Sequence, residues 1–141
     1  MKTAKQIQSD IINLLKGSDL ANTVNGKIYR ATPESSSRPR NSKAEDILVI
    51  FTKGFPWQIQ TGIVTINIYV PDIENPDNGV LIEDGRRCEE LEIAACNWVE
   101  SLTTDKSDYK FSLQQTIYTE AEPKINQHFV VVKLKYELLT I

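Results

Sequence analysis

Two segments of the chain repeat their apolar residues at the spacing of a helix. Residues 3–16 place them on one face with polar residues on the other, and Gly17 supplies a stop signal. Residues 82–102 repeat apolar side chains every three or four positions. We predict an amphipathic helix in each segment, with Trp98 as a core residue of the second. The apolar positions are Ala4, Ile7, Ile11, Leu14 and Leu15 in the first segment and Cys88, Leu91, Ala95, Trp98 and Leu102 in the second.

Alternating apolar and polar residues predict the strands. Residues 57–70, 109–121 and 126–139 alternate along their length, and we expect the last two segments to form a hairpin. Residues 46–52 are apolar at nearly every position, which is typical of a strand buried on both faces. A shorter strand is expected at residues 27–30. The predicted order of elements is therefore α-β-β-β-α-β-β.

This order predicts a two-layer α+β fold. Long strands joined by short turns favour a mainly antiparallel sheet, with both helices packed on one of its faces. The length of 141 residues corresponds to one domain, which we expect to span residues 1–141. With 40% hydrophobic and 25% charged residues, the chain can form a core without disulfides or metals.

One long connector interrupts the alternating pattern. Residues 31–43 contain two prolines and no large apolar side chain, so we predict a flexible loop. Its basic residues Arg38, Arg40 and Lys43 outnumber its one acidic residue, Glu34. These three basic residues are candidates for contacting an acidic surface or the phosphates of a nucleic acid.

Charge is divided unevenly along the chain, whose net charge is -3. Residues 2–53 hold nine Lys or Arg against five Asp or Glu, whereas residues 54–141 hold seven against fourteen. This asymmetry could place a basic face of one protomer against an acidic face of the next, attract nucleic acid, or be scattered over solvated surface. Candidates for the acidic partner face are Glu89, Glu90 and Glu92, which an ordinary solvated helix face would also explain.

The residues offer little for catalysis. His128 is the only histidine, and Cys88 and Cys96 stand too far apart on one predicted helix for a disulfide. We expect a half-exposed His128, reduced cysteines, and no enzymatic, metal or cofactor site. The segment at residues 71–79 contains acidic residues but lacks the spacing of a calcium loop, and it predicts a turn-rich connector. No apolar run approaches the roughly 20 residues that span a membrane, and the N-terminus has no signal-peptide pattern.

The arrangement of elements is similar to that of one known family. A helix is followed by the turn and short strand of Val24–Arg30, a Pro- and Ser-rich loop and the apolar strand Ile47–Ile50. The strand Gly62–Val70 then runs into Pro71, and a helix and a terminal hairpin complete the chain. This layout resembles the tail completion, or tail terminator, proteins of long-tailed bacteriophages and prophages, together with related small neck proteins. The resemblance covers most of the chain and rests on element order and hydrophobic spacing.

The resemblance implies a virion structural protein without catalysis. Such a protein forms a ring, commonly a hexamer, on the last ring of the tail tube, ends tube polymerisation and offers the head–tail joining surface to head-completion or connector proteins. The loop at residues 31–43 would order against a neighbouring subunit, the tube or DNA in the lumen. The resemblance also implies assembly in the host cytoplasm, a final place in the virion tail or neck, and no membrane partner.

Two other classes of protein remain open at this point. One is a small bacterial α+β domain that binds a ligand or a partner without catalysis. In that case the helix-free face of the sheet would form a concave surface holding Tyr69, Tyr118 and Phe129. The other is a small enzyme or nuclease, for which the sequence offers no motif.

Overall fold

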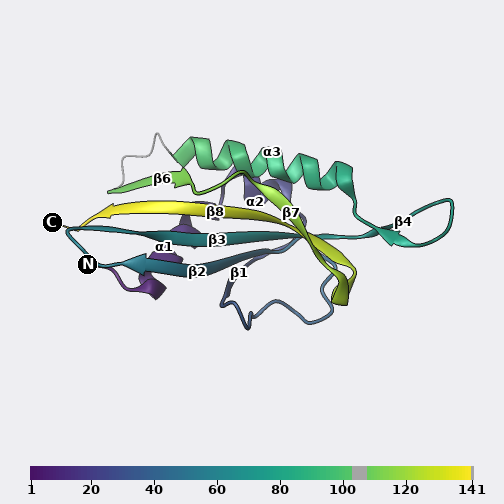
Figure 1. Cartoon of the computed structure of the whole chain (residues 1–141), viewed down its shortest axis with the longest axis horizontal. Coiled ribbons are helices and arrows are strands. Elements are labelled where there is room, and N and C mark those ends of the chain that lie inside the picture. The colour runs from purple at the N-terminus through teal and green to yellow at the C-terminus, as the bar shows by residue number, and fades with distance from the viewer. Residues whose placement is uncertain (103–107, 141) are drawn as a thin grey trace.

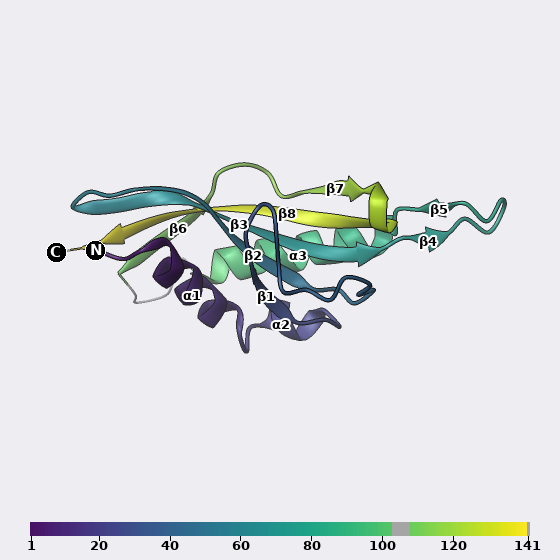
Figure 2. The ribbon, with the colours of Figure 1, turned by 90° about the horizontal axis from the view of Figure 1, so that it is seen from below.

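A sheet and its helices form two layers (Figure 1, Figure 2). The computed structural model describes residues 1–102 and 108–140. Within these ranges, three α-helices lie on one face of a six-stranded, mainly antiparallel sheet, which confirms the predicted α+β class. The helices are α1 (Ala4–Leu15), α2 (Asp19–Thr23) and α3 (Gly85–Leu102).

The sheet is built around two long central strands. Its order is β1-β2-β3-β8-β6, and β7 also pairs with β8. Among the described strand pairings of this sheet, that of β1 with β2 is parallel and the other four are antiparallel. The central pair, β3 and β8, runs from Ile59 opposite Leu139 to Pro71 opposite Gln127. The strands are β1 (Ile28–Ala31), β2 (Ile47–Phe55), β3 (Ile59–Pro71), β6 (Tyr109–Leu113), β7 (Tyr118–Glu122) and β8 (Gln127–Leu139).

Three details differ from the sequence-based expectation. The second predicted helix begins at Gly85, because the two residues Leu81 and Ile82 form strand β5, which pairs with β4 (Ile73–Glu74). The predicted hairpin partner of β8 is split into β6 and β7, which pair with different parts of β8. The short helix α2, capped by the side chain of Ser18, was not predicted.

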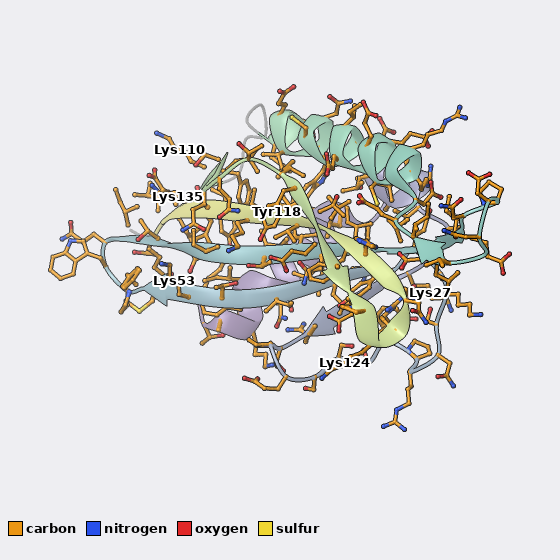
Figure 3. The ribbon with its side chains drawn as sticks, turned by 45° about the vertical axis from the view of Figure 1, so that its right-hand side comes forward. Lys27, Lys53, Lys110, Tyr118, Lys124 and Lys135 are labelled. Atoms are coloured by element: carbon orange, nitrogen blue, oxygen red, sulfur yellow. The ribbon has the colours of Figure 1, made fainter. Side chains whose placement is uncertain are left out.

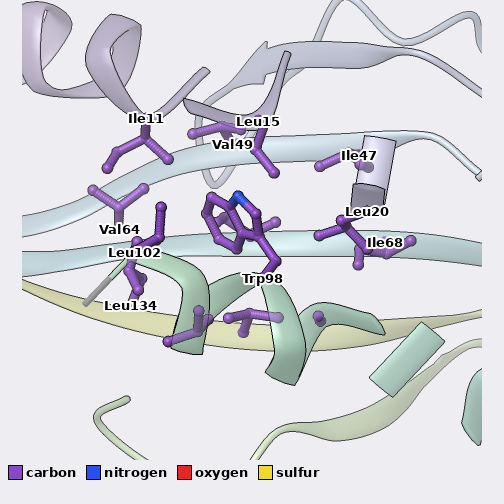
Figure 4. Packing of buried hydrophobic residues seen from close by; sticks show 14 of the residues in the cluster. Ile11, Leu15, Leu20, Ile47, Val49, Val64, Ile68, Trp98, Leu102 and Leu134 are labelled. Atoms are coloured by element: carbon purple, nitrogen blue, oxygen red, sulfur yellow. The ribbon is translucent and has the colours of Figure 1, made fainter. Parts of the chain in front are cut away.

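The core lies between the helices and the covered face of the sheet (Figure 4). Ile11 and Leu15 of α1 and Trp98 of α3 point toward the strands. Trp98 is 4% exposed, which confirms its predicted place in the core. The strands contribute the alternate residues that face the helices, among them Val49, Val64, Ile66, Ile68, Val130, Val132, Leu134 and Tyr136. The residues between them face away from the helices.

Candidate assembly surfaces

Arg38 anchors its loop to the sheet. Its Nε donates a hydrogen bond to Asp46 Oδ2 at 2.8 Å, and the two side chains are 8% and 2% exposed. The guanidinium also donates to Gln127 Oε1 at 2.9 Å and lies 4.2 Å from the centre of the Tyr69 ring. In the single chain the Arg38 guanidinium is therefore held against the sheet, unlike an exposed residue, and its contact with a partner or a nucleic acid stays a prediction. Its partners Asp46 and Gln127 lie outside residues 31–43, so the composition of that segment does not reveal them.

The Asp46 carboxylate is held in its charged form by the groups around it. Burial raises the pKa of Asp46, but hydrogen bonds from the Ser42 hydroxyl, the backbone N–H of Lys27 and the Arg38 guanidinium outweigh that effect. The pKa of Asp46 is therefore lower than its ordinary value of 3.8. The ion pair and its hydrogen bonds hold this part of the loop against the sheet.

The other two basic candidates have a different environment. Arg40 and Lys43 are exposed to solvent, at the surface of the same loop. They stay candidates for contact with an acidic surface. Arg38 holds the loop beside the sheet, so Arg40 and Lys43 extend from an anchored segment.

The three glutamates predicted as an acidic partner face do not act alike. Glu90 accepts a hydrogen bond from Arg87 at 2.9 Å, and Glu92 accepts one from the Thr119 hydroxyl at 2.6 Å. Glu89 is exposed. Arg87 offsets the charge of Glu90, and Glu92 is bonded to β7. Of the three, only Glu89 is an exposed carboxylate with no ion pair shown in the described structure.

His128 contacts a carboxylate, and the two cysteines are not bonded to each other. His128 Nδ1 lies 2.6 Å from Asp72 Oδ1 at the end of β3, and its side chain is 20% exposed. Cys88 and Cys96 are free thiols, and burial raises the pKa of Cys88 to about 12. Among residues 1–102 and 108–140, no three His, Cys, Asp or Glu side chains gather as metal ligands. No helix in that same part of the chain is long and apolar enough to cross a membrane.

A two-stranded arm projects from one end of the molecule (Figure 1, Figure 2). We define the arm as residues 72–84, which contain β4 and β5. Its turn is closed by hydrogen bonds from Gly79 N to Asn75 O at 2.7 Å and from Val80 N to Asn78 Oδ1 at 2.9 Å. Gly79 has a φ of 71°, a left-handed conformation that favours glycine. Four apolar side chains of the arm are 40–57% exposed: Ile73, Val80, Leu81 and Ile82.

The turn between β2 and β3 exposes apolar side chains at the opposite end (Figure 1). Trp57 is 74% exposed and Phe55 is 60% exposed. Ile59 and Leu139 lie directly opposite each other in the β3–β8 register, and each is about half exposed. Large apolar residues that gather on a surface in this way mark interaction sites.

The hairpin of β2 and β3 is firmly supported near this turn. The hydroxyls of Thr52 and Thr65 are 2.6 Å apart across the two strands. A Cβ added at Gly62 would collide with the carbonyl oxygen of Lys53 and the ring of Tyr136, so the backbone and this ring are in close contact. The exposed aromatic residues therefore sit on a well-packed support.

Three lysines, Lys53, Lys110 and Lys135, lie toward this end of the sheet (Figure 3). Lys53 and Lys135 are aligned in one row across the sheet, each paired with Ile63 of β3. Lys110 lies opposite Glu137 of β8. Side chains alternate along a strand, and the neighbours of Lys110 and Lys135 face the core, so these two lysines belong to the helix-free face. Lys53 shares the row of Lys135 across the sheet and belongs to the same face. We call this surface the tip patch: Lys53, Phe55, Trp57, Ile59, Lys110, Lys135 and Leu139.

The arm carries the opposite charge. No Lys or Arg occurs between positions 54 and 85, so every charged residue of the arm is acidic. The charged positions of the arm are Asp72, Glu74, Asp77, Glu83 and Asp84.

Neither surface was predicted from the sequence. The features that could have indicated them are the aromatic residues on either side of Pro56, at a predicted turn, and the long interval without basic residues. The pattern of apolar residues predicted a strand at Trp57 and a plain connector at residues 71–79. Neither prediction indicates that the two segments lie at opposite ends of the fold.

No protein-family model matches the chain, and no curated protein matches it. The function proposed below therefore rests on the geometry of the molecule and on the resemblance in layout.

Proposed function

We propose that this protein is a structural subunit that joins copies of itself end to end, and that the assembly is a ring of the tail-terminator or related neck type. The observation that carries the proposal is the position of the arm and the tip patch at opposite ends of the molecule (Figure 1). Each surface exposes several large apolar side chains. Trp57, the most exposed aromatic residue of the tip patch, is of the residue type that most often anchors interfaces.

Two different surfaces at opposite ends favour a heterologous contact. In such a contact one patch of a subunit meets a different patch of its neighbour, and the series closes into a ring when the rotation between subunits divides a full turn. A symmetric dimer would instead bring one patch against itself, and like charges would then meet. A ring is the form that the resemblance to tail terminators implies.

In this proposal the ring caps the tail tube and presents a joining surface to head-completion or connector proteins. The exposed Arg40 and Lys43 extend from the anchored loop and are suited to an acidic surface of the tube or to DNA in the lumen. They would supply weak, salt-sensitive contacts, because few charges are involved.

Light scattering after size exclusion, over a range of protein and salt concentrations, tests the proposal. We expect oligomers that grow with protein concentration and weaken with salt, and rings when the largest species is viewed by electron microscopy. A chain that stays monomeric at every concentration, both alone and with tail tubes of the phage or prophage that encodes it, would contradict the proposal. Tail-tube, tape-measure or portal genes beside its gene would support the terminator assignment in particular.

A further inference from the structure

We propose that the arm of one copy binds the tip patch of the next copy, and that this one contact, repeated, builds the assembly. The inference rests on the proposed function, since it requires that copies of the chain join, and it adds which two surfaces meet. Its basis is the match between an acidic, apolar arm and a lysine-bearing, apolar patch.

The arm lacks packing of its own. Its strands are two residues long each, with Ile73 opposite Ile82 and Glu74 opposite Leu81. A two-stranded hairpin by itself is marginally stable in water, and an uncovered apolar strand edge favours association. A surface on another molecule would cover these apolar side chains and stabilise the arm.

Of the five carboxylates of the arm, two are bonded to the rest of the chain, the exposed Glu83 lies at the base of the arm next to α3, and two are exposed near its end. Asp72 lies within hydrogen-bond distance of His128, and Asp84 accepts a hydrogen bond from a backbone N–H of α3. Glu74 and Asp77 are exposed. The negative charge that a partner would meet is therefore concentrated at Glu74 and Asp77, next to the apolar residues.

The tip patch has the complementary layout. Ile59 and Leu139 form an apolar pair across β3 and β8, and exposed lysines lie on the neighbouring strands and further along β8. Lys53, Lys110 and Lys135 lie toward the same end of the sheet as this pair (Figure 3). An acidic arm laid on this patch would bury apolar residues against apolar residues and bring carboxylates near lysines.

The contact can form only between copies, because the arm and the tip patch lie at opposite ends of one molecule (Figure 2). Each copy then uses each surface once, which leaves none uncovered in a closed ring. The strands of the arm are only two residues long, so we expect it to bury less than the roughly 800 Å² per partner of a standard interface. A single contact is therefore weak, and closure of the ring strengthens it by making the last contact intramolecular.

Charge reversal tests this pairing. We expect Glu74→Lys with Asp77→Lys, and separately Lys53→Glu with Lys110→Glu, each to raise the protein concentration needed for half assembly by about tenfold or more, because like charges then meet. An equimolar mixture of the two double variants should assemble again, since the arm of each variant now meets a patch of opposite charge. Light scattering of the single variants and of the mixture measures this.

Lys27→Glu with Lys124→Glu provides the matched control. It changes the net charge by the same amount as Lys53→Glu with Lys110→Glu does, at two lysines that lie away from the tip patch (Figure 3). This variant should assemble as the unaltered chain does. Circular dichroism of every variant confirms that the fold is retained.

The possible failures can be told apart. Assembly that is unaffected by the reversals, or a mixture that does not reassemble, would overturn the arm-to-patch contact while self-assembly stands. An unaltered chain that never assembles would overturn the proposed function itself. If Lys53→Glu with Lys110→Glu abolishes binding to a short fluorescent DNA duplex and leaves assembly unchanged, the patch serves nucleic acid and the inference is wrong.

Discussion

The segment at residues 32–46, which continues the predicted loop as far as Asp46, and the arm at residues 72–84 are opposite in structure. Both are connectors that contain turn-forming residues. The loop is tied to the sheet by the buried ion pair of Arg38 and Asp46, whereas the arm extends from the sheet with its apolar side chains exposed. The difference shows that a connector is ordered by the partners it finds elsewhere in the fold. It also separates a segment that stabilises the monomer from one that is available to a neighbour.

The largest effect is expected from removing the loop's buried carboxylate. Asp46→Ala leaves the Arg38 guanidinium buried and unpaired, and should lower the free energy of unfolding by about 3–5 kcal/mol. Asp77→Ala removes a carboxylate from the exposed arm and should change the free energy of unfolding by less than about 0.5 kcal/mol. Urea denaturation of both variants measures the contrast. Equal losses in the two variants would show that the loop and the arm do not differ as described.

Two glycines sharpen the same comparison. A Cβ at Gly26 would collide with the side chain of Asp46 and the backbone of Glu45, so Gly26→Ala should cost about 1–3 kcal/mol of global stability. Gly79 has open space around it, but its left-handed backbone disfavours alanine. Gly79→Ala should therefore speed hydrogen exchange in the arm and leave the global unfolding midpoint nearly unchanged. A lower global midpoint for Gly79→Ala would show that the arm contributes to the stability of the body.

Acid should reduce the difference between the unaltered chain and Asp46→Asn. Because the folded-state pKa of Asp46 is lowered, its contribution is fully present above the ordinary value of 3.8 and is lost as the pH falls through the lower folded value. The difference in unfolding midpoint between the two proteins should be large at neutral pH. It should shrink as the pH falls below about 3.8. A gap that is constant with pH would contradict the role given to Asp46.

The smallest effect on stability is expected in the apolar part of the arm. Leu81→Ser should alter the free energy of unfolding by less than about 0.5 kcal/mol, because Leu81 is exposed, yet it should weaken assembly. Ile93→Ser, at an exposed position of α3, should affect neither property. Thermal denaturation and light scattering together measure both. A loss of stability above about 1 kcal/mol for Leu81→Ser would mean that the arm packs against its own chain.

Hydrophobic periodicity was sufficient to predict most of the secondary structure. The helix at residues 4–15 and the strands β2, β3 and β8 follow directly from which positions are apolar, because one face of each element must be buried. The bounds of α3 and the split of β6 from β7 could not be predicted, because they depend on pairing with β4 and with different parts of β8.

The candidate surfaces show the same division. The sequence by itself determined the fold class, the core positions such as Trp98, and the signs of charge along the chain. The tertiary structure alone decided that Arg38 is buried against Asp46 and Gln127, and that the arm and the tip patch lie at opposite ends. The physical reason is distance along the chain. Local patterns depend on neighbours a few positions away, whereas ion pairs and exposed ends depend on residues brought together only when the sheet forms.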